Sequence, residues 1–155
     1  MSKKIPFKRR RQKLTNYQKR LKLIKSNKPR LVIRISNKYI TCQLVNYKAN
    51  GDEVVTSFTS KKLSDYGFKG SKNLQSAYLA GLVTGLKALK KDVKNAVLDT
   101  GLKTSVKNSR IYACLKGALD AGVKIPHGPE VLPNDKLLKK QDLDKYIKSI
   151  TSGVK

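Results

Sequence analysis

Lysine and arginine side chains crowd the first third of this sequence, and their type and spacing suit the binding of phosphate groups. Sixteen of them fall within the first 51 residues, and no acidic residue precedes Asp52. Nucleic acids carry closely spaced phosphates and release condensed counterions, with a gain in entropy, when Lys and Arg replace those ions. Because nothing within the segment neutralises its charge, the sequence predicts a nucleic-acid contact surface here.

Aromatic side chains lie among these cations. Phe7 precedes the run Lys8-Arg9-Arg10-Arg11, and Tyr17 and Tyr39 follow it. In RNA-binding surfaces such rings stack on unpaired bases while the cations hold the phosphates. Plainer interpretations stay open: the run could be a nuclear-import-like address or a solvated tail, and Tyr17 could be the first core residue of its helix. The basic surroundings favour RNA.

Residues for catalysis are sparse. Nucleases that use two metals need a cluster of carboxylates, whereas the acidic residues here are scattered along the chain. Asp99 stands out because it follows a short apolar stretch, where α/β sites often lie; alternatively its carboxylate caps the following turn. His127, the sole histidine, is expected to be a loop residue bonded to backbone. We therefore predict no enzyme, no metal, no cofactor and no small-molecule substrate.

Cys42 and Cys114 are 72 positions apart and have no Cys-x-x-Cys spacing. We expect two reduced thiols packed as small apolar groups, because a structural zinc site needs about four ligands. No apolar run approaches the ~20 residues that span a bilayer, and the basic start lacks the apolar region of a signal peptide. The sequence predicts a soluble intracellular protein that has no membrane partner.

The 155 residues carry a net charge of +25, and 39% of them are hydrophobic. This length is enough for one domain with a true core, and so large a charge suggests a complex that supplies counter-charge. We predict a basic RNA-binding arm and helix over residues 1–27, a globular core over 28–133 and a C-terminal helix or tail over 134–155. Residues 1–13 should be disordered when the protein is alone.

Hydrophobic periodicity predicts a mixed α/β fold. Period two over 31–36, 39–47 and 53–59, with a hairpin signal at Asn50-Gly51, predicts three antiparallel strands. Helical spacing then predicts a helix, a short buried strand at 96–98 and a second helix over 109–121. Two further helices are expected, one capped by Thr15 and one over 135–150. The first long helix should be capped by Ser71. Within it, Ala77, Gly81 and Gly85 should allow the backbone to approach the sheet closely.

Several segments resemble the archaeal form of the ribosomal protein eighteen family of the large subunit. They are KIPFKRRRQKLTNYQKRLKLIKSNKPRLVIRISNKYI, YGFKGSKN leading into AYLAGLVTG, and VLDTGL followed by RIYACLKGALDAGVKIPHG. The similarity runs from about Lys4 to Pro133. It implies a ribonuclease-H-like core without nuclease activity that binds 5S rRNA in the central protuberance. This chain has Phe68 where the family usually has Trp and Asn108 where Gly is common, and both changes should be tolerated.

The resemblance also implies which residues meet RNA, through the arm, the junction between arm and core, and the first strands. With Lys8 from the basic run, the predicted RNA-binding residues are Lys8, Arg9, Arg10, Arg11, Lys13, Tyr17, Arg20, Arg30, Arg34, Asn37, Lys38, Lys69 and Lys72. The expected partners are 5S rRNA, large-subunit rRNA and neighbouring ribosomal proteins, within the large subunit of the cytoplasmic ribosome. Two alternatives stay open: a general nucleic-acid-compacting protein, suggested by charge alone, and a ribonuclease, suggested by fold and Asp99.

Overall fold

A four-stranded mixed sheet is the framework of the protein. The computed structural model describes residues 5–153, and its sheet has the order β3-β2-β1-β4. The strands are β1 (Arg30–Ile35), β2 (Ile40–Asn46), β3 (Glu53–Thr59) and β4 (Val97–Asp99). The first three are antiparallel neighbours, whereas β4 joins β1 in parallel. The predicted antiparallel meander and the mixed α/β class are confirmed.

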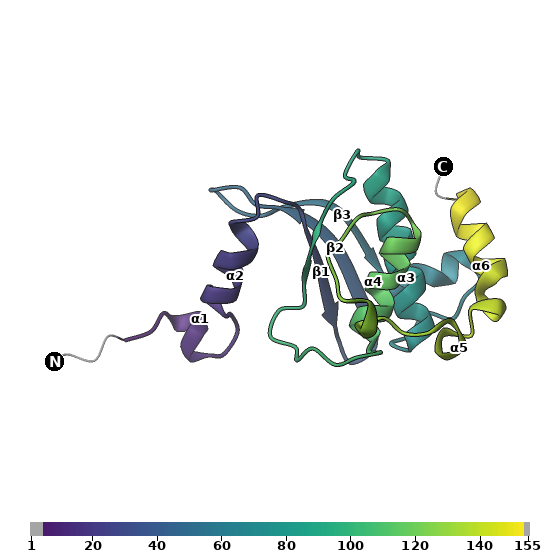
Figure 1. Cartoon of the computed structure of the whole chain (residues 1–155), viewed down its shortest axis with the longest axis horizontal. Coiled ribbons are helices and arrows are strands. Elements are labelled where there is room, and N and C mark those ends of the chain that lie inside the picture. The colour runs from purple at the N-terminus through teal and green to yellow at the C-terminus, as the bar shows by residue number, and fades with distance from the viewer. Residues whose placement is uncertain (1–4, 154–155) are drawn as a thin grey trace.

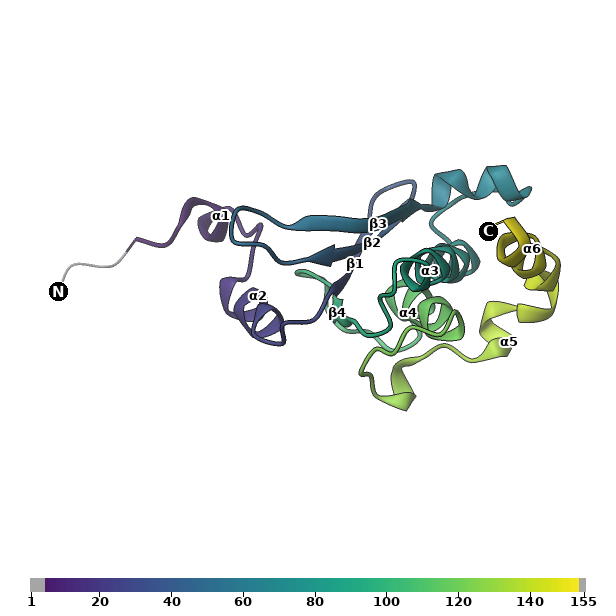
Figure 2. The same ribbon diagram turned by 90° about the horizontal axis from the view of Figure 1, so that it is seen from above.

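Helices lie on both sides of this sheet and at the end of the molecule opposite to the arm (Figures 1 and 2). They are α1 (Lys8–Arg11), α2 (Tyr17–Ile24), α3 (Leu74–Leu89), α4 (Arg110–Asp120), α5 (Asp135–Leu138) and α6 (Lys140–Gly153), with the 3-10 turns η1 (Ser60–Tyr66) and η2 (Pro129–Val131). The helices α3 and α4 lie side by side, and α6 lies at the end of the molecule opposite to the arm (Figures 1 and 2). Within residues 5–153, no helix has the length and apolar character needed to cross a bilayer.

Alternation along the strands gives the sheet two different faces. Leu31, Ile33 and Leu44 point toward α3 and α4 and are almost completely buried. The opposite side, which we call the outer face, carries every second residue of the same strands. It consists of Arg30, Val32, Arg34, Thr41, Gln43, Val45, Ser57, Thr59, Val97 and Asp99. Since successive side chains of a strand point to opposite sides, the polar residues of β1 and β2 gather on the outer face.

The close packing of α3 on α4 depends on glycine. A Cβ at Gly81 of α3 would overlap the carbonyl oxygen of Cys114, and one at Gly117 of α4 would overlap the carbonyl oxygen of Tyr78. The predicted ladder of small residues therefore exists, but the expectation that it faces the sheet was wrong. It faces α4, because the backbones of the two helices touch where only glycine leaves room.

Replacing Gly81 with Ala should destabilise the protein by about 1–3 kcal/mol or more, because overpacking forces two backbones apart. The better helix propensity of Ala, about 1 kcal/mol, offsets only part of that loss. Gly128→Ala is the control, since its Cβ meets nothing within 4 Å and its φ is −78°. Urea unfolding of both variants checks this; equal stabilities would contradict the tight helix contact.

Cys42 of β2 and Cys114 of α4 are both fully buried, and their side chains face each other with Cα atoms 7.7 Å apart, farther than a disulfide spans. The expected burial of the two side chains is confirmed, and their reduced state stays a prediction. The packing of α4 against the sheet brings the two side chains together across 72 residues, and spacing in the sequence cannot reveal such a contact.

Helix ends differ from the sequence predictions where a neighbouring residue makes a better cap. Asn16 rather than Thr15 caps α2, and Asn73 rather than Ser71 caps α3, each accepting a backbone N–H bond through its side chain. The helix expected over 135–150 is broken at Lys139, whose φ is 49°. A residue in this left-handed region cannot continue a right-handed helix, so α5 and α6 are separate.

The C-terminal segment packs onto the core instead of trailing away from it. Leu138, Leu143 and Ile150 are buried to 1% exposure or less, and the rings of Phe68 and Tyr146 meet edge-on at 5.0 Å. Phe at position 68 thus fills an aromatic contact. Asn108 has a φ of 57°, a conformation that glycine adopts freely and asparagine tolerates. The division at residues 27 and 133 stays a prediction.

Candidate nucleic-acid interface

Helix α2 lies over one half of the outer face and encloses a cavity of about 330 Å³ beneath it. We call this space the arm cavity. The chain enters α2 through Asn16, whose side-chain oxygen accepts the N–H of Lys19 at 3.1 Å. The cavity is lined by Arg9, Leu14, Thr15, Asn16, Lys19, Arg20, Leu23, Arg30, Val32, Arg34, Gln43, Val45, Asp52, Val54, Asp99, Gly101 and Leu102. Four of the predicted RNA-binding cations thus meet in one place: Arg9, Arg20, Arg30 and Arg34.

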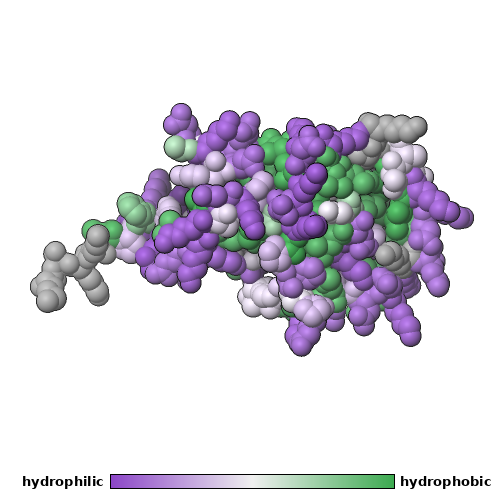
Figure 3. Space-filling view, turned by 45° about the horizontal axis from the view of Figure 1, so that its top comes forward, coloured by the Kyte–Doolittle hydropathy of each residue, from purple (hydrophilic) through white to green (hydrophobic). Residues whose placement is uncertain are grey.

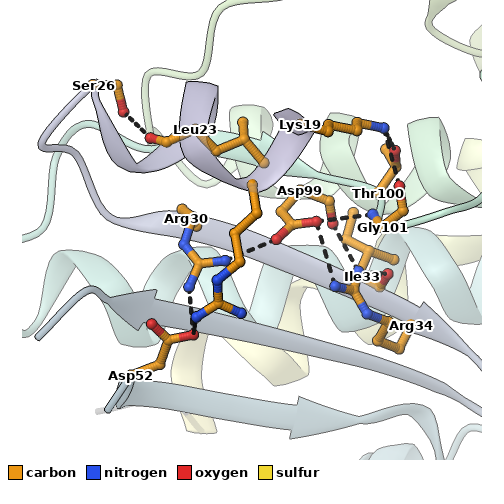
Figure 4. Close-up of polar contacts among 11 residues, drawn as sticks. Lys19, Leu23, Ser26, Arg30, Ile33, Arg34, Asp52, Asp99, Thr100 and Gly101 are labelled. Atoms are coloured by element: carbon orange, nitrogen blue, oxygen red, sulfur yellow. Dashed lines mark hydrogen bonds and ion pairs between the residues drawn. The ribbon is translucent and has the colours of Figure 1, made fainter. Parts of the chain in front are cut away.

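Arg30 is the centre of a chain of ion pairs in this cavity. Its Nη2 lies 2.6 Å from Oδ2 of Asp52, and its Nη1 lies 2.9 Å from Oδ2 of Asp99 (Figure 4). Arg20 pairs with Asp52 at 2.9 Å, and Arg34 pairs with Asp99 at 3.3 Å. We call these five residues the arginine–aspartate network. Arg30 itself is only 3% exposed, so its charge faces the two carboxylates and not solvent.

Asp99 caps the turn that follows β4, as one of the two predicted alternatives stated. Its Oδ1 accepts the N–H of Gly101 at 2.8 Å. Burial alone would raise the pKa of Asp99, but the Gly101 N–H and the Arg34 and Arg30 guanidinium groups outweigh it and lower that pKa. The carboxylate therefore stays ionised at neutral pH. It is held by arginine, which makes it a structural anion and a poor proton acceptor.

His127, the other residue considered for catalysis, also has a structural role. The Nδ1 atom of His127 lies 2.7 Å from the carbonyl oxygen of Ile125, so the prediction of a loop histidine bonded to backbone is confirmed. Among residues 5–153, no three His, Cys, Asp or Glu side chains are placed to share a metal ion.

Lys19 is a site residue that the sequence analysis did not identify. Its Nζ donates to Oγ1 of Thr100 at 3.0 Å and to the carbonyl oxygen of Gly101 at 3.1 Å. These bonds tie α2 to the turn after β4. Because more than 80 residues separate the partners, no sequence pattern points to them.

The arm presents cations and rings without burying them. All four residues of α1 are exposed, and Arg9 donates from Nε to Oγ1 of Thr15 at 3.1 Å. The rings of Phe7 and Tyr17 meet edge-on at 5.7 Å and are 75% and 37% exposed. Tyr17 is thus no core residue, and both rings have free area. Lys3 and Lys4 lie outside the described residues.

A second group of predicted residues lies at the other end of β1. Asn37 and Lys38 form the turn after this strand, and Lys69 and Lys72 lie between η1 and α3; all four are exposed. The Ser60 hydroxyl accepts the N–H of Ile40 and donates to the carbonyl of Ser71, at 3.0 and 2.8 Å. These bonds hold the two segments together. The predicted residues therefore form two groups, which the polar outer face connects.

Hydrophilic side chains dominate the end of the molecule that carries the arm and α2 (Figure 3). Hydrophobic residues show more strongly toward the helical end in the same view. This asymmetry fits a protein that presents one end and the outer face to a polyanion.

Known proteins resemble this chain over most of its length. A family model described as "Ribosomal large subunit proteins 60S L5, and 50S L18" matches residues 2–96 and 89–128. The protein named "Large ribosomal subunit protein uL18" from Korarchaeum cryptofilum is 45% identical over 148 residues, covering 95% of this chain and 76% of the relative. The protein of that name from Aeropyrum pernix is 44% identical, with coverages of 95% and 70%. The one from Methanococcus maripaludis is 47% identical, with coverages of 95% and 77%.

Proposed function

The chain belongs to the family of large-subunit ribosomal proteins that comprises 60S L5 and 50S L18, and on that basis we propose that it binds 5S rRNA and attaches it to the central protuberance. Membership makes it a structural, non-enzymatic component of the large subunit in the cytoplasmic ribosome, associated with rRNA and ribosomal proteins. The ribonuclease alternative is thereby closed. The proposal adds the particular RNA and its position.

One observation carries the proposal: the cations of residues 8–13 have no counter-charge among residues 5–153. Lys8, Arg9, Arg10, Arg11 and Lys13 form no ion pair with any residue in the range 5–153. They are all exposed. Seven Lys and Arg fall among residues 1–13, and a phosphate backbone would neutralise them with release of its counterions. Residues 1–13 would thus supply affinity.

The outer face would supply recognition of shape. Folded RNA is recognised largely through the geometry of its backbone and sugars and through stacking on splayed bases. A rigid strand surface that carries Arg34, Thr41 and Gln43 suits the first task, and the Phe7 and Tyr17 rings suit the second. Arg30 would act indirectly, because its burial lets it hold Asp52 and Asp99 in place without presenting its own charge.

A competition assay tests the proposal against the compacting alternative. The full-length protein, bound to labelled 5S rRNA, is challenged with unlabelled 5S rRNA and with duplex DNA of equal length at a fixed salt concentration. We expect 5S rRNA to displace the label at far lower concentration than DNA. Equal competition would mean that charge alone drives binding, as in a general compacting protein.

Replacing Arg34 with Ala should weaken 5S rRNA binding by about 1–3 kcal/mol if its half-exposed guanidinium makes a charge-assisted bond to RNA. The side chain is 49% exposed and is already oriented by its pair with Asp99. Titration of labelled 5S rRNA measures the affinity. The control is Lys145→Ala, since Lys145 is an exposed cation of α6. Similarly small losses of 5S rRNA affinity in both variants would mean that Arg34 makes no specific bond to RNA.

A further inference from the structure

We propose that the arm cavity is a pocket for one backbone phosphate of the bound RNA. The phosphate enters between α2 and the outer face. The inference rests on the proposed function and names the place where one phosphate is held. Its ligand is a single phosphodiester with its adjoining sugar. The cavity, about 330 Å³, lies at the lower end of the ~300–1,000 Å³ typical of small-ligand sites.

The charge that lines the cavity favours an anion. Five cations line it, contributed by α1, α2 and β1, against only two carboxylates, those of Asp52 and Asp99. The walls therefore carry a surplus of three positive charges. Partial burial lowers the effective dielectric and strengthens the mutual repulsion of these charges. An anion seated among them would relieve that repulsion, whereas a neutral or cationic group would not.

Arg30 contributes charge to the wall of the cavity without a direct bond to the ligand. The side chain of Arg30 is 4% exposed. Both of its terminal nitrogens are bonded to carboxylates, but its Nε has no hydrogen-bond partner within the described structure. Buried N–H groups in native proteins nearly always have an acceptor. The Nε atom has almost no accessible surface, however, so a ligand in the cavity would not reach it, and Arg30 contributes only its positive charge to the wall.

The remaining cations are already held in position to receive the phosphate. Lys19 is tied to Thr100 and Gly101, and Arg34 donates from Nη1 to the carbonyl oxygens of Ile33 and Asp99. Arg20 uses only Nη2 for its bond to Asp52 among residues 5–153, which leaves its Nε and Nη1 for a ligand. Side chains ordered before binding lose little entropy when the phosphate arrives.

Titration of the full-length protein with inorganic phosphate tests the pocket directly. The ¹⁵N resonances of the arginine Nε–Hε groups report each guanidinium separately. We expect a saturable shift at Arg20, and an affinity about tenfold weaker in Arg20→Gln, the factor that one lost charge-assisted bond represents. Lys22→Gln is the control, because Lys22 is an exposed cation of the same helix that does not line the cavity.

Two results would overturn the pocket. One is a phosphate response that is equal in Arg20→Gln and Lys22→Gln. The other is shifts spread evenly over all exposed cations, including Arg10 and Arg11. Lys19→Gln is a second test variant, and the circular dichroism spectrum of each variant must match that of the wild-type protein. Arg20 is 42% exposed at its side chain, so its replacement by Gln should leave the fold intact.

Measurements with 5S rRNA separate failure of the pocket from failure of the proposed function. In Arg20→Gln, the slope of log affinity against log salt should fall by about 1, the effect of one lost phosphate contact. Preferential 5S rRNA binding with equal slopes in Arg20→Gln and Lys22→Gln would reject the pocket and leave the proposed function standing. Phosphate saturation without any preference for 5S rRNA over duplex DNA would reject the proposed function alone.

Discussion

Deletion of residues 1–13 should weaken 5S rRNA binding by orders of magnitude and flatten its salt dependence. The segment holds seven Lys and Arg and no acid, and α1 within it buries no residue. Each neutralised phosphate contributes about 0.7–0.9 to the slope of log affinity against log salt. If each cation meets one phosphate, the slope should fall by about 5–6. Filter binding of labelled 5S rRNA across a salt series measures both quantities.

The control for this deletion removes charge from the far end of the molecule. Lys136, Lys139, Lys145 and Lys148 are exposed on α5, α6 and the residue between them, and their joint replacement by Gln should change the slope little. Circular dichroism of the deleted protein should show an intact fold, since no core residue is lost. An unchanged salt slope in the deleted protein would remove the arm from the binding surface. Equal effects in both proteins would mean that only total charge matters.

Replacing Arg30 with Met should destabilise the fold by about 3–5 kcal/mol, because removal of one member of a buried ion pair leaves an uncompensated charge. Asp99 would lose its bond at 2.9 Å to the Arg30 guanidinium while its side chain stays only 9% exposed. Asp52 would lose its bond of 2.6 Å as well. Urea unfolding monitored by circular dichroism gives the difference in free energy.

The exposed ion pair Lys48–Glu53 supplies the matched comparison. Its two side chains are 64% and 52% exposed, so Lys48→Met should cost no more than about 1 kcal/mol. The double variant Arg30→Met with Asp99→Leu should recover part of the stability, because it also removes the stranded carboxylate. A loss below 1 kcal/mol in Arg30→Met would show that water reaches the network freely.

The pH dependence of stability gives an independent check on Asp99. Its pKa is lower in the folded protein than the ordinary value of 3.8, so its ion pairs stabilise the fold fully above that ordinary value. This contribution declines as the pH falls below 3.8 and is lost once the pH passes the lowered pKa of the folded state. In Asp99→Leu, this part of the acid-induced loss of stability should be absent.

Ion pairs between distant segments let the protein keep much of its charge in a folded state. Acids from the β2–β3 hairpin and from the end of β4 neutralise cations that stand near the start of the chain. The cations of residues 8–13 receive no such neutralisation among residues 5–153. Stability and RNA binding therefore draw on different arginines: Arg30 on the first, and Arg9, Arg10 and Arg11, in our proposal, on the second.

The sequence by itself determined the strands and the principal helices, because these follow from local periodicity. Glu53–Thr59 forms a strand within the predicted bounds, and Arg110–Asp120 forms a helix within one residue of them. The side chains of a strand alternate between two faces and those of a helix recur every three to four residues. Apolar residues at those spacings therefore identify an element whatever the rest of the chain does. The cationic character of the first 51 residues is likewise local.

Only the tertiary structure decided which distant residues meet. The sequence indicated that nothing neutralises the cations before Asp52, yet Arg30 lies between Asp52 and Asp99, which are 22 and 69 residues away. Cys42 and Cys114 meet across 72 residues, and the glycines of α3 face α4. Such contacts depend on β4 returning in parallel beside β1 and on α4 then packing against α3. Strand order and helix packing minimise the energy of the whole chain, and no single segment encodes them.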